Sequence, residues 1–426
     1  MTPTLALLAL LLVGVAGTLL VVSGRREWRP SLLDALLVAL AFRVALFVIA
    51  KDVAPYDLLN DFRIAGENVL AHQDPTLNSR PRGWSYLPTY AFLLAGMVAF
   101  EEWTGLPWLS VARVLPICFD LGVVVLVWTL GGREKGGLRA FQYACTPIAF
   151  FVSAVHGQME PLCLLFALAA FLAARPGTGR RALAAGALLG LAVSVKTWPL
   201  LFLPALLIGL PTWRARGQLL LGGLAVGLTL LLTMPLTVGT PFRSLPEIVS
   251  TIVGYNSAGG TWGWSAIVFL VEPYTYESFE TSTFWATVGR IGSLATLAAI
   301  VAAVWWWRRA HPVVLAGVTA SVFQVTTAGH GAQYLAWPAP FTVLAPTRLL
   351  PLLQVAIGVW AWWAYIGLGS GLAPAAWDGW VYRVAPLSSL VLVALIVLAL
   401  PWRQRRAADA EPAPPADEPE AAPARA

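Results

Sequence analysis

The chain alternates between long apolar runs and short polar connections along almost its whole length. Many of the runs approach the roughly 20 residues that an α-helix needs to cross the hydrocarbon core of a bilayer. The pattern predicts about 13 spans, so we expect an all-α, polytopic integral membrane protein. Several runs are shorter than a full crossing, which favours tilted or broken helices. The predicted spans are residues 4–23, 31–50, 107–130, 141–156, 158–174, 183–196, 198–212, 217–236, 283–307, 313–328, 333–347, 350–368 and 384–402.

Two connections are longer than the others, at residues 51–106 and 237–282. The first contains a further apolar piece, Tyr86 to Phe100. Counting it as a span would break the charge pattern described next, so we expect a helix that lies in or dips into the outer interface. The second loop interleaves glycines with aromatic residues around Trp262. Because tryptophan favours the headgroup level of a bilayer, we expect an ordered interfacial loop there, with Trp262 as a substrate-binding candidate.

Basic residues give the expected orientation. Mean hydropathy is +0.71 and only 12% of residues are charged, yet lysines and arginines gather in alternate connections, which stay cytoplasmic. We therefore predict a cell-membrane protein with both long loops outside and the C-terminus inside. The net charge of +6 then reflects topology and lipid contact, with no nucleic acid partner. The connections concerned carry Arg25, Arg26 and Arg29; Arg133, Lys135 and Arg139; Arg175, Arg180 and Arg181; Arg214 and Arg216; Arg308 and Arg309; Arg348; and Arg403, Arg405 and Arg406.

The pattern predicts one transmembrane domain over residues 1–402, followed by a tail. Residues 403–426 are rich in Ala, Pro and Glu, a composition that cannot bury enough apolar surface to fold. We expect this segment to be a disordered cytoplasmic tail. No cysteine, histidine or carboxylate spacing typical of a metal site occurs, and no phosphate-binding glycine loop is present, so we expect neither a metal nor a cofactor.

Candidate chemistry begins in the first loop, just after the second predicted span. Asp57 and Asp61 are four residues apart and would share one face of a helix that begins here, which Asp57 could also cap. A carboxylate within hydrogen-bond reach of an acceptor hydroxyl can take its proton and act as a general base. The alternative is that one aspartate caps the helix and the other is solvated. The spacing leaves open which of the two is the base.

A second polar group is confined between two apolar runs. His156, Gln158 and Glu160 occupy every second position at a junction that is too short for a solvated loop. Ionisable groups at or just inside a bilayer surface are energetically costly and indicate a functional site. Hydrogen bonding to a phosphate or a sugar is the functional interpretation, and an interhelical polar clamp is the structural one. Lys196 reaches the same face, where a compact cation suits a phosphate, although snorkelling to headgroups would also explain it.

Further candidates lie at the outer junctions. His330, Gln333 and Tyr334 are expected either to bind substrate or to cap a helix, and Arg63, Arg82 and Tyr86 could contact an anionic donor. Charged residues within the predicted spans are expected to form structural pairs, and these are Arg43, Arg113, Asp120 and Arg290.

Taken in chain order, these short motifs resemble those of the GT-C glycosyltransferases that use polyprenyl-phosphate sugars, including polyprenol-phosphate-mannose-dependent mannosyltransferases. The resemblance covers most of residues 31–346. The matching pieces are Asp57 or Asp61 with Phe62-Arg63, then Tyr86-Leu87-Pro88, Asp120-Leu121, His156-Gly157-Gln158, Lys196 ahead of a proline-containing apolar run, and Gln333-Tyr334-Leu335-Ala336-Trp337, which looks like a stretch of the GPI mannosyltransferase catalytic subunit. The spacing from acid to aromatic residue departs from the family pattern, and an extra span precedes the family's core.

The resemblance implies a GT-C-like bundle that transfers a hexosyl, mannosyl-type residue outside the cytoplasm. Asp57 or Asp61 would deprotonate the acceptor hydroxyl of a glycolipid, glycan or protein. The oxygen would displace a polyprenyl phosphate with inversion. His156, Gln158 and Lys196, with Arg63 and Arg82, would hold the departing phosphate, and Tyr86, Glu160, Trp262, His330, Gln333 and Tyr334 would contact substrate. The rival hypothesis is a transporter or flippase for a lipid-linked sugar, which requires charges at several depths along a polar path.

Overall fold

The protein is helical, as expected. The computed structural model describes residues 1–78, 84, 86–175, 179–253, 263–272, 282–329, 331–367 and 381–404, and within them it contains helices and no β-strand. The first half carries α1 (Pro3–Arg25), α2 (Leu32–Ile49), α3 (Arg63–Leu70), α4 (Pro88–Thr104), α5 (Trp108–Ala144), α6 (Pro147–Phe151), α7 (Glu160–Ala173), α8 (Gly179–Val195), α9 (Leu203–Gly209) and α10 (Trp213–Thr237). The second half carries α11 (Leu245–Val253), α12 (Ala266–Val271), α14 (Thr283–Trp306), α15 (Pro312–Thr326), α16 (Ala339–Leu344), α17 (Leu350–Tyr365) and α18 (Val381–Ala399).

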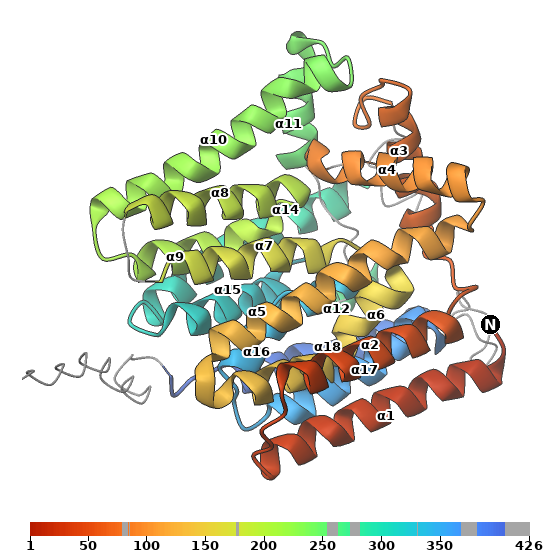
Figure 1. Ribbon diagram of the computed structural model, residues 1–426, viewed down its shortest axis with the longest axis vertical. Coiled ribbons are helices and arrows are strands. Elements are labelled where there is room, and N and C mark those ends of the chain that lie inside the picture. The colour runs from red at the N-terminus through yellow and green to blue at the C-terminus, as the bar shows by residue number, and fades with distance from the viewer. Residues whose placement is uncertain are drawn as a thin grey trace, which may run out of the picture.

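Among the described residues, five helices are long and apolar enough to cross a bilayer by length and composition: α1, α2, α5, α10 and α14. Other apolar helices are shorter than a crossing. Figure 1 shows the long helices running side by side, with α1 at one edge of the bundle and α10 at the other. The architecture is that of an all-α polytopic membrane protein. The five long helices do not establish a count of about 13 spans.

Several predicted spans are broken helices, and proline explains the breaks. The run predicted as 141–156 consists of the end of α5, then α6 and the π-helical turn η2 (Val152–His156). Pro147 has no backbone N–H to continue the preceding helix, so the chain restarts there. The run 198–212 likewise divides into a 3-10 turn, η3 (Trp198–Phe202), and α9. The run 333–347 divides into η5 (Ala332–Ala336) and α16.

The two long loops contain helices. In the first, α3 and α4 follow a π-helical turn, η1 (Leu58–Phe62), and α4 occupies the apolar piece that was predicted to be helical. A Cβ on Gly66 of α3 would lie 2.9 Å from the backbone of Leu94, so α3 and α4 pack closely. The second loop contains η4 (Phe242–Ser244), α11 and α12. Residues 254–262, with the predicted Gly/Trp segment, and tail residues 405–426 lie outside the described residues.

Close contact between α8 and α10 depends on glycine. A Cβ on Gly186 would lie 1.9 Å from the carbonyl oxygen of Leu219, and one on Gly222 would lie 2.3 Å from that of Leu183. Small residues allow helix backbones to approach in a membrane, where the hydrophobic effect does not drive association. The two helices are therefore packed closely against each other.

The charged residues predicted to pair within the spans behave differently from one another. Arg43 and Asp120 form a fully buried ion pair at 2.6 Å, and Asp120 also accepts hydrogen bonds from Tyr143 and Ser153. For the other two arginines the pairing prediction is wrong. Arg113 is fully buried and donates to backbone carbonyls, and Arg290 lies exposed on α14. A guanidinium carries five donors and can be satisfied by carbonyls alone, which a charge-pairing argument overlooks.

Candidate active site

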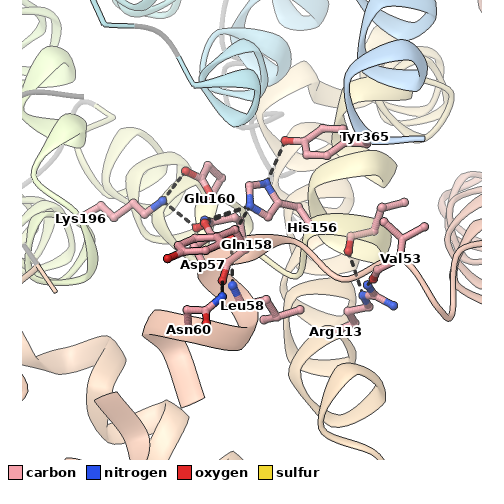
Figure 2. Close-up of polar contacts among 12 residues, drawn as sticks. Val53, Asp57, Leu58, Asn60, Arg113, His156, Gln158, Glu160, Lys196 and Tyr365 are labelled. Atoms are coloured by element: carbon pink, nitrogen blue, oxygen red, sulfur yellow. Dashed lines mark hydrogen bonds and ion pairs between the residues drawn. The ribbon is translucent and has the colours of Figure 1, made fainter. Parts of the chain in front are cut away.

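Three segments that are far apart in the chain meet in one polar cluster (Figure 2). Asp57 is the N-cap residue of η1. His156 ends η2, Gln158 lies in the turn that follows it, and Glu160 is the first residue of α7. Lys196 follows the C-terminal end of α8. The sequence predicted that these side chains share one face of the protein, and the structure brings them into direct contact.

Asp57 is the centre of the cluster. His156 Nε2 lies 2.9 Å from Asp57 Oδ1 and 3.0 Å from Oδ2, and the side-chain amide of Gln158 donates to Oδ2. The backbone N–H of Leu58 donates to Oδ1 at 3.0 Å, so Asp57 caps its helical turn as the sequence suggested. Its side chain remains 27% exposed, so Asp57 is not sealed off from solvent.

Electrostatics keep Asp57 ionised. Burial alone would raise the pKa of Asp57, but the hydrogen bond from His156, the charge of Lys196 and the Leu58 N–H together hold the pKa below its usual value. The carboxylate is therefore the resting form at neutral pH and can accept a proton.

Lys196 forms the second half of the cluster. Its ammonium donates to Gln158 Oε1 at 2.8 Å and to Glu160 Oε1 at 2.7 Å, and it lies 5.2 Å from the centre of the Tyr86 ring. Gln158 and Glu160 are fully buried, and Lys196 is 4% exposed. Because Lys196 binds the carbonyl end of the Gln158 amide, the NH₂ end must face Asp57. Gln158 thus links Lys196, the one cation of the cluster among the residues that the structure describes, to the carboxylate of Asp57.

Arg113 fixes the segments on both sides of the cluster. Its Nε donates to the carbonyl of Val155 at 2.9 Å, one residue before His156. Its Nη2 donates to the carbonyl of Val53, four residues before Asp57. Gly157 then turns the chain with φ = 69°, a conformation that glycine adopts without strain, and this turn directs His156 and Gln158 toward the same carboxylate.

A stack of aromatic rings joins the third predicted segment to Lys196. The Tyr334 ring lies 4.2 Å from Trp337, and Trp337 stacks on Trp198 at 4.4 Å with a 4° angle between planes. Trp198 follows Lys196 by two residues. Gln333 lies in the same 3-10 turn as Tyr334. A Cβ on Gly331 would lie 2.7 Å from its side-chain oxygen, so the Gln333 amide packs against Gly331. Tyr334 therefore reaches the cluster through packed rings.

The other predicted residues fall into two groups. Arg63 lies 3.3 Å from Glu67 and 3.4 Å from Glu101, so it joins α3 to α4. Asp61 is half-buried within η1, and the hydrogen bonds described above converge on Asp57. Arg82, Trp262 and His330 lie outside the described residues.

Sequence reasoning missed Tyr365, the last residue of α17. Its hydroxyl lies 2.9 Å from His156 Nδ1, and Figure 2 shows it beside the imidazole. Tyr365 ends an apolar, tryptophan-rich run, Trp360 to Tyr365, which is the composition of an ordinary membrane-interface belt. No local signal distinguishes it.

An apolar groove of about 350 Å³ lies next to the cluster. Residues of α8, α9 and α10 line it, together with Leu87 and Thr197, which directly follow Tyr86 and Lys196 in the chain. On α10 the lining runs from Leu219 to Leu231, which corresponds to about 18 Å along a helix. The groove therefore includes the immediate chain neighbours of Tyr86 and Lys196, although none of the polar side chains of the cluster lines it.

These features define a polytopic membrane protein with a carboxylate-centred polar site beside an apolar groove. The model of glycosyltransferase family 87 matches residues 84–327, which is more than half of the chain, and the chain therefore belongs to glycosyltransferase family 87. No curated protein matches it. The protein is thus a membrane glycosyltransferase, which uses a sugar donor and an acceptor. His156, Gln158, Glu160 and Lys196 lie within the matched segment, whereas Asp57 precedes it.

Proposed function

We propose that the protein is a GT-C-type enzyme that transfers a hexosyl residue of the mannosyl class from a polyprenyl-phosphate sugar to an acceptor hydroxyl, with inversion, on the extracytoplasmic side of the cell membrane. Asp57 is the general base. The single observation that carries the proposal is the contact of a partly exposed Asp57 carboxylate with His156 and Gln158, next to a buried lysine and an apolar groove.

The reaction needs a base that is ionised and held in place. Asp57 meets both requirements, because His156, Gln158 and Leu58 fix its oxygens and keep its pKa low. As the acceptor oxygen bonds to the anomeric carbon, its O–H becomes acidic and the proton passes to Asp57. The bond from the anomeric carbon to the phosphate oxygen breaks, and its electron pair stays on the departing polyprenyl phosphate. Attack opposite the leaving group inverts the anomeric configuration.

Lys196 is the residue that we assign to the phosphate. Two of its N–H groups bind Gln158 and Glu160, and a third remains for a ligand because an ammonium has three. Both ring nitrogens of His156 and both ends of the Gln158 amide have partners within the cluster. We therefore assign His156 and Gln158 to orienting Asp57 rather than to holding the phosphate directly.

Charge in the cluster favours a phosphodiester donor. Asp57 and Glu160 carry negative charge, and Lys196 is already paired with Glu160. A nucleotide diphosphate would bring at least two more negative charges to one paired cation, whereas a polyprenyl-phosphate sugar brings one. Uncompensated charge is costly in a buried site. The groove is lined mostly by leucine and glycine along α8 and α10. Its lining residue Thr197 directly follows Lys196, so the groove suits an isoprenoid chain attached to that phosphate.

The test is transfer by purified protein in proteoliposomes that contain polyprenyl-phosphate hexose and candidate glycolipid, glycan and peptide acceptors. The proposal predicts a new glycosidic bond and free polyprenyl phosphate, and little product from nucleotide sugars. Movement of the donor across the bilayer without a new bond would instead identify a flippase. Comparing the glycolipids and glycans of a strain that lacks the protein with those of its parent would identify the acceptor.

Replacing Lys196 by methionine is expected to lower kcat/KM about 100-fold, because the variant keeps the chain length but loses the cation beside the leaving phosphate. Lys196→Arg should recover part of the loss. The exposed Lys51 of the first loop provides the matched control, since Lys51→Met should change kcat/KM less than about twofold. Steady-state kinetics with varied donor checks this, and an unchanged Lys196→Met enzyme would remove Lys196 from the phosphate site.

The pH dependence follows from the lowered pKa of Asp57. The carboxylate form is active, so activity should persist down to about pH 4 and fall only at lower pH, below the usual range of an aspartate. His156→Ala removes the largest favourable contribution and should move this acid limb to higher pH. Initial rates measured at each pH give the position of the acid limb of the pH profile. Samples returned to neutral pH after brief exposure show whether the loss of activity is reversible. A wild-type limb centred near pH 6 would contradict the assignment.

A further inference from the structure

Tyr365 contacts the site from a helix that supplies no other member of the cluster. Its hydroxyl lies 2.9 Å from His156 Nδ1, and its ring centre lies 5.1 Å from the imidazole centre. The ring also stacks on Phe151 at 6.1 Å with an 11° angle between planes. Packing on Phe151 fixes the ring, so the hydroxyl is held where it meets His156.

The hydrogen-bond pattern determines which His156 nitrogen carries the proton. An ionised carboxylate only accepts hydrogen bonds, so the nitrogen that faces Asp57, Nε2, must donate. In a neutral imidazole the other nitrogen, Nδ1, then has a lone pair. Tyr365 O–H is positioned to donate to it. The chain of donors therefore runs from Tyr365 to His156 to Asp57.

We propose that Tyr365 is a positioning residue for glycosyl transfer: its hydroxyl holds His156 in the Nε2–H form that donates to Asp57. The inference rests on the proposed function, in which Asp57 is the base. Without the Tyr365 hydroxyl, the Nδ1–H form of His156 becomes accessible. That form presents a lone pair to the Asp57 carboxylate and withdraws the hydrogen bond that orients it.

The position of α17 explains why the contact is rigid. A Cβ on Gly358 of α17 would lie 2.7 Å from Pro147, and Trp362 donates from its ring N–H to the carbonyl of Ala6 in α1 at 2.7 Å. The helix is thus packed between α1 and the break that precedes α6. Helices α1 and α17 lie outside residues 84–327, the segment that the family model matches, so Tyr365 joins the catalytic cluster to parts of the chain beyond that segment.

Tyr365→Phe is the direct test, because it removes the hydroxyl and keeps the stacking ring. We expect kcat to fall about 5- to 10-fold, as for loss of one neutral hydrogen bond, with KM for the donor within about twofold and an unchanged melting temperature. The acid limb of the pH profile should move to higher pH, because Asp57 loses part of the donation that keeps its pKa low. The titratable groups around Asp57 are His156, Glu160, Lys196, Tyr90 and Tyr365, and the substitution leaves the first four in place.

Combining Tyr365→Phe with a His156 substitution shows whether Tyr365 acts through His156 or only through general packing. In a His156→Ala background, Tyr365→Phe should change kcat less than about twofold, since the group through which Tyr365 acts is gone. Leu352→Ala, at an exposed position of the same helix, is the matched control and should leave kcat within about twofold.

Two results would overturn the inference while leaving the proposed function intact: wild-type kcat and acid limb in Tyr365→Phe, or equal losses from Tyr365→Phe with and without His156. Both presume that Asp57→Asn is inactive. Full activity of Asp57→Asn would instead contradict the proposed function itself.

Discussion

Asp57→Asn should lower kcat more than about 1,000-fold while leaving the protein folded. The amide keeps the shape of the carboxylate, but it cannot take the proton of an acceptor hydroxyl and carries no charge. It also faces the His156 N–H and the Gln158 NH₂ with only one acceptor oxygen. Single-turnover transfer from polyprenyl-phosphate hexose measures the loss, and the melting temperature in detergent verifies the fold.

Asp61→Asn is the matched comparison, because both aspartates lie in the same turn of the first loop. We expect Asp61→Asn to retain at least about a tenth of the wild-type kcat. The opposite result, an active Asp57→Asn and an inactive Asp61→Asn, would assign the base to Asp61. The sequence alone left these alternatives open.

Arg113→Met should destabilise the protein by about 3 kcal/mol, because buried carbonyls that lose their donor cost about 1–3 kcal/mol each. The guanidinium serves the carbonyls of Val155, Ala50, Lys51 and Val53, and methionine fills the space without any donor. Thermal unfolding in detergent should show a midpoint lower by roughly 3 °C. Activity should also fall at permissive temperature, because the Asp57 and His156 segments are no longer joined.

Arg290→Met is the control for Arg113→Met. Arg290 lies within a predicted span but is exposed on α14, so its replacement should leave the melting midpoint within about 1 °C. Arg113→Lys should be intermediate, because a lysine keeps the charge but not the planar fork that reaches several carbonyls. A stable Arg113→Met protein would show that the two segments are held by other contacts.

Much of the site could be predicted because its residues are polar interruptions in apolar sequence. His156, Gln158 and Lys196 are conspicuous for that reason, and they do converge on the first loop. Their roles could not be predicted from spacing. The structure shows that the His156 ring and the Gln158 amide bind Asp57, and only the spatial arrangement of donors and acceptors reveals this.

The fold, like the site, could be predicted in part from the sequence. Continuous apolar runs predicted α1, α2, α10 and α14 well, whereas the broken helices around His156 and Tyr334 were predicted as single spans. Hydropathy averages over a window and does not register a restart at Pro147. Arg113 was predicted to pair with an acid because charge is visible in the sequence, while the backbone carbonyls that bind it are not. Tyr365 carried no signal, since its contact is made over a separation of 209 residues.

The anomeric configuration of the product, measured by NMR together with the amount of polyprenyl phosphate released, tests the central claim most directly. The account predicts an inverted linkage and one polyprenyl phosphate per bond formed by the wild-type protein, and neither product from Asp57→Asn. Retention of configuration, or product formed at the wild-type rate by Asp57→Asn, would contradict it.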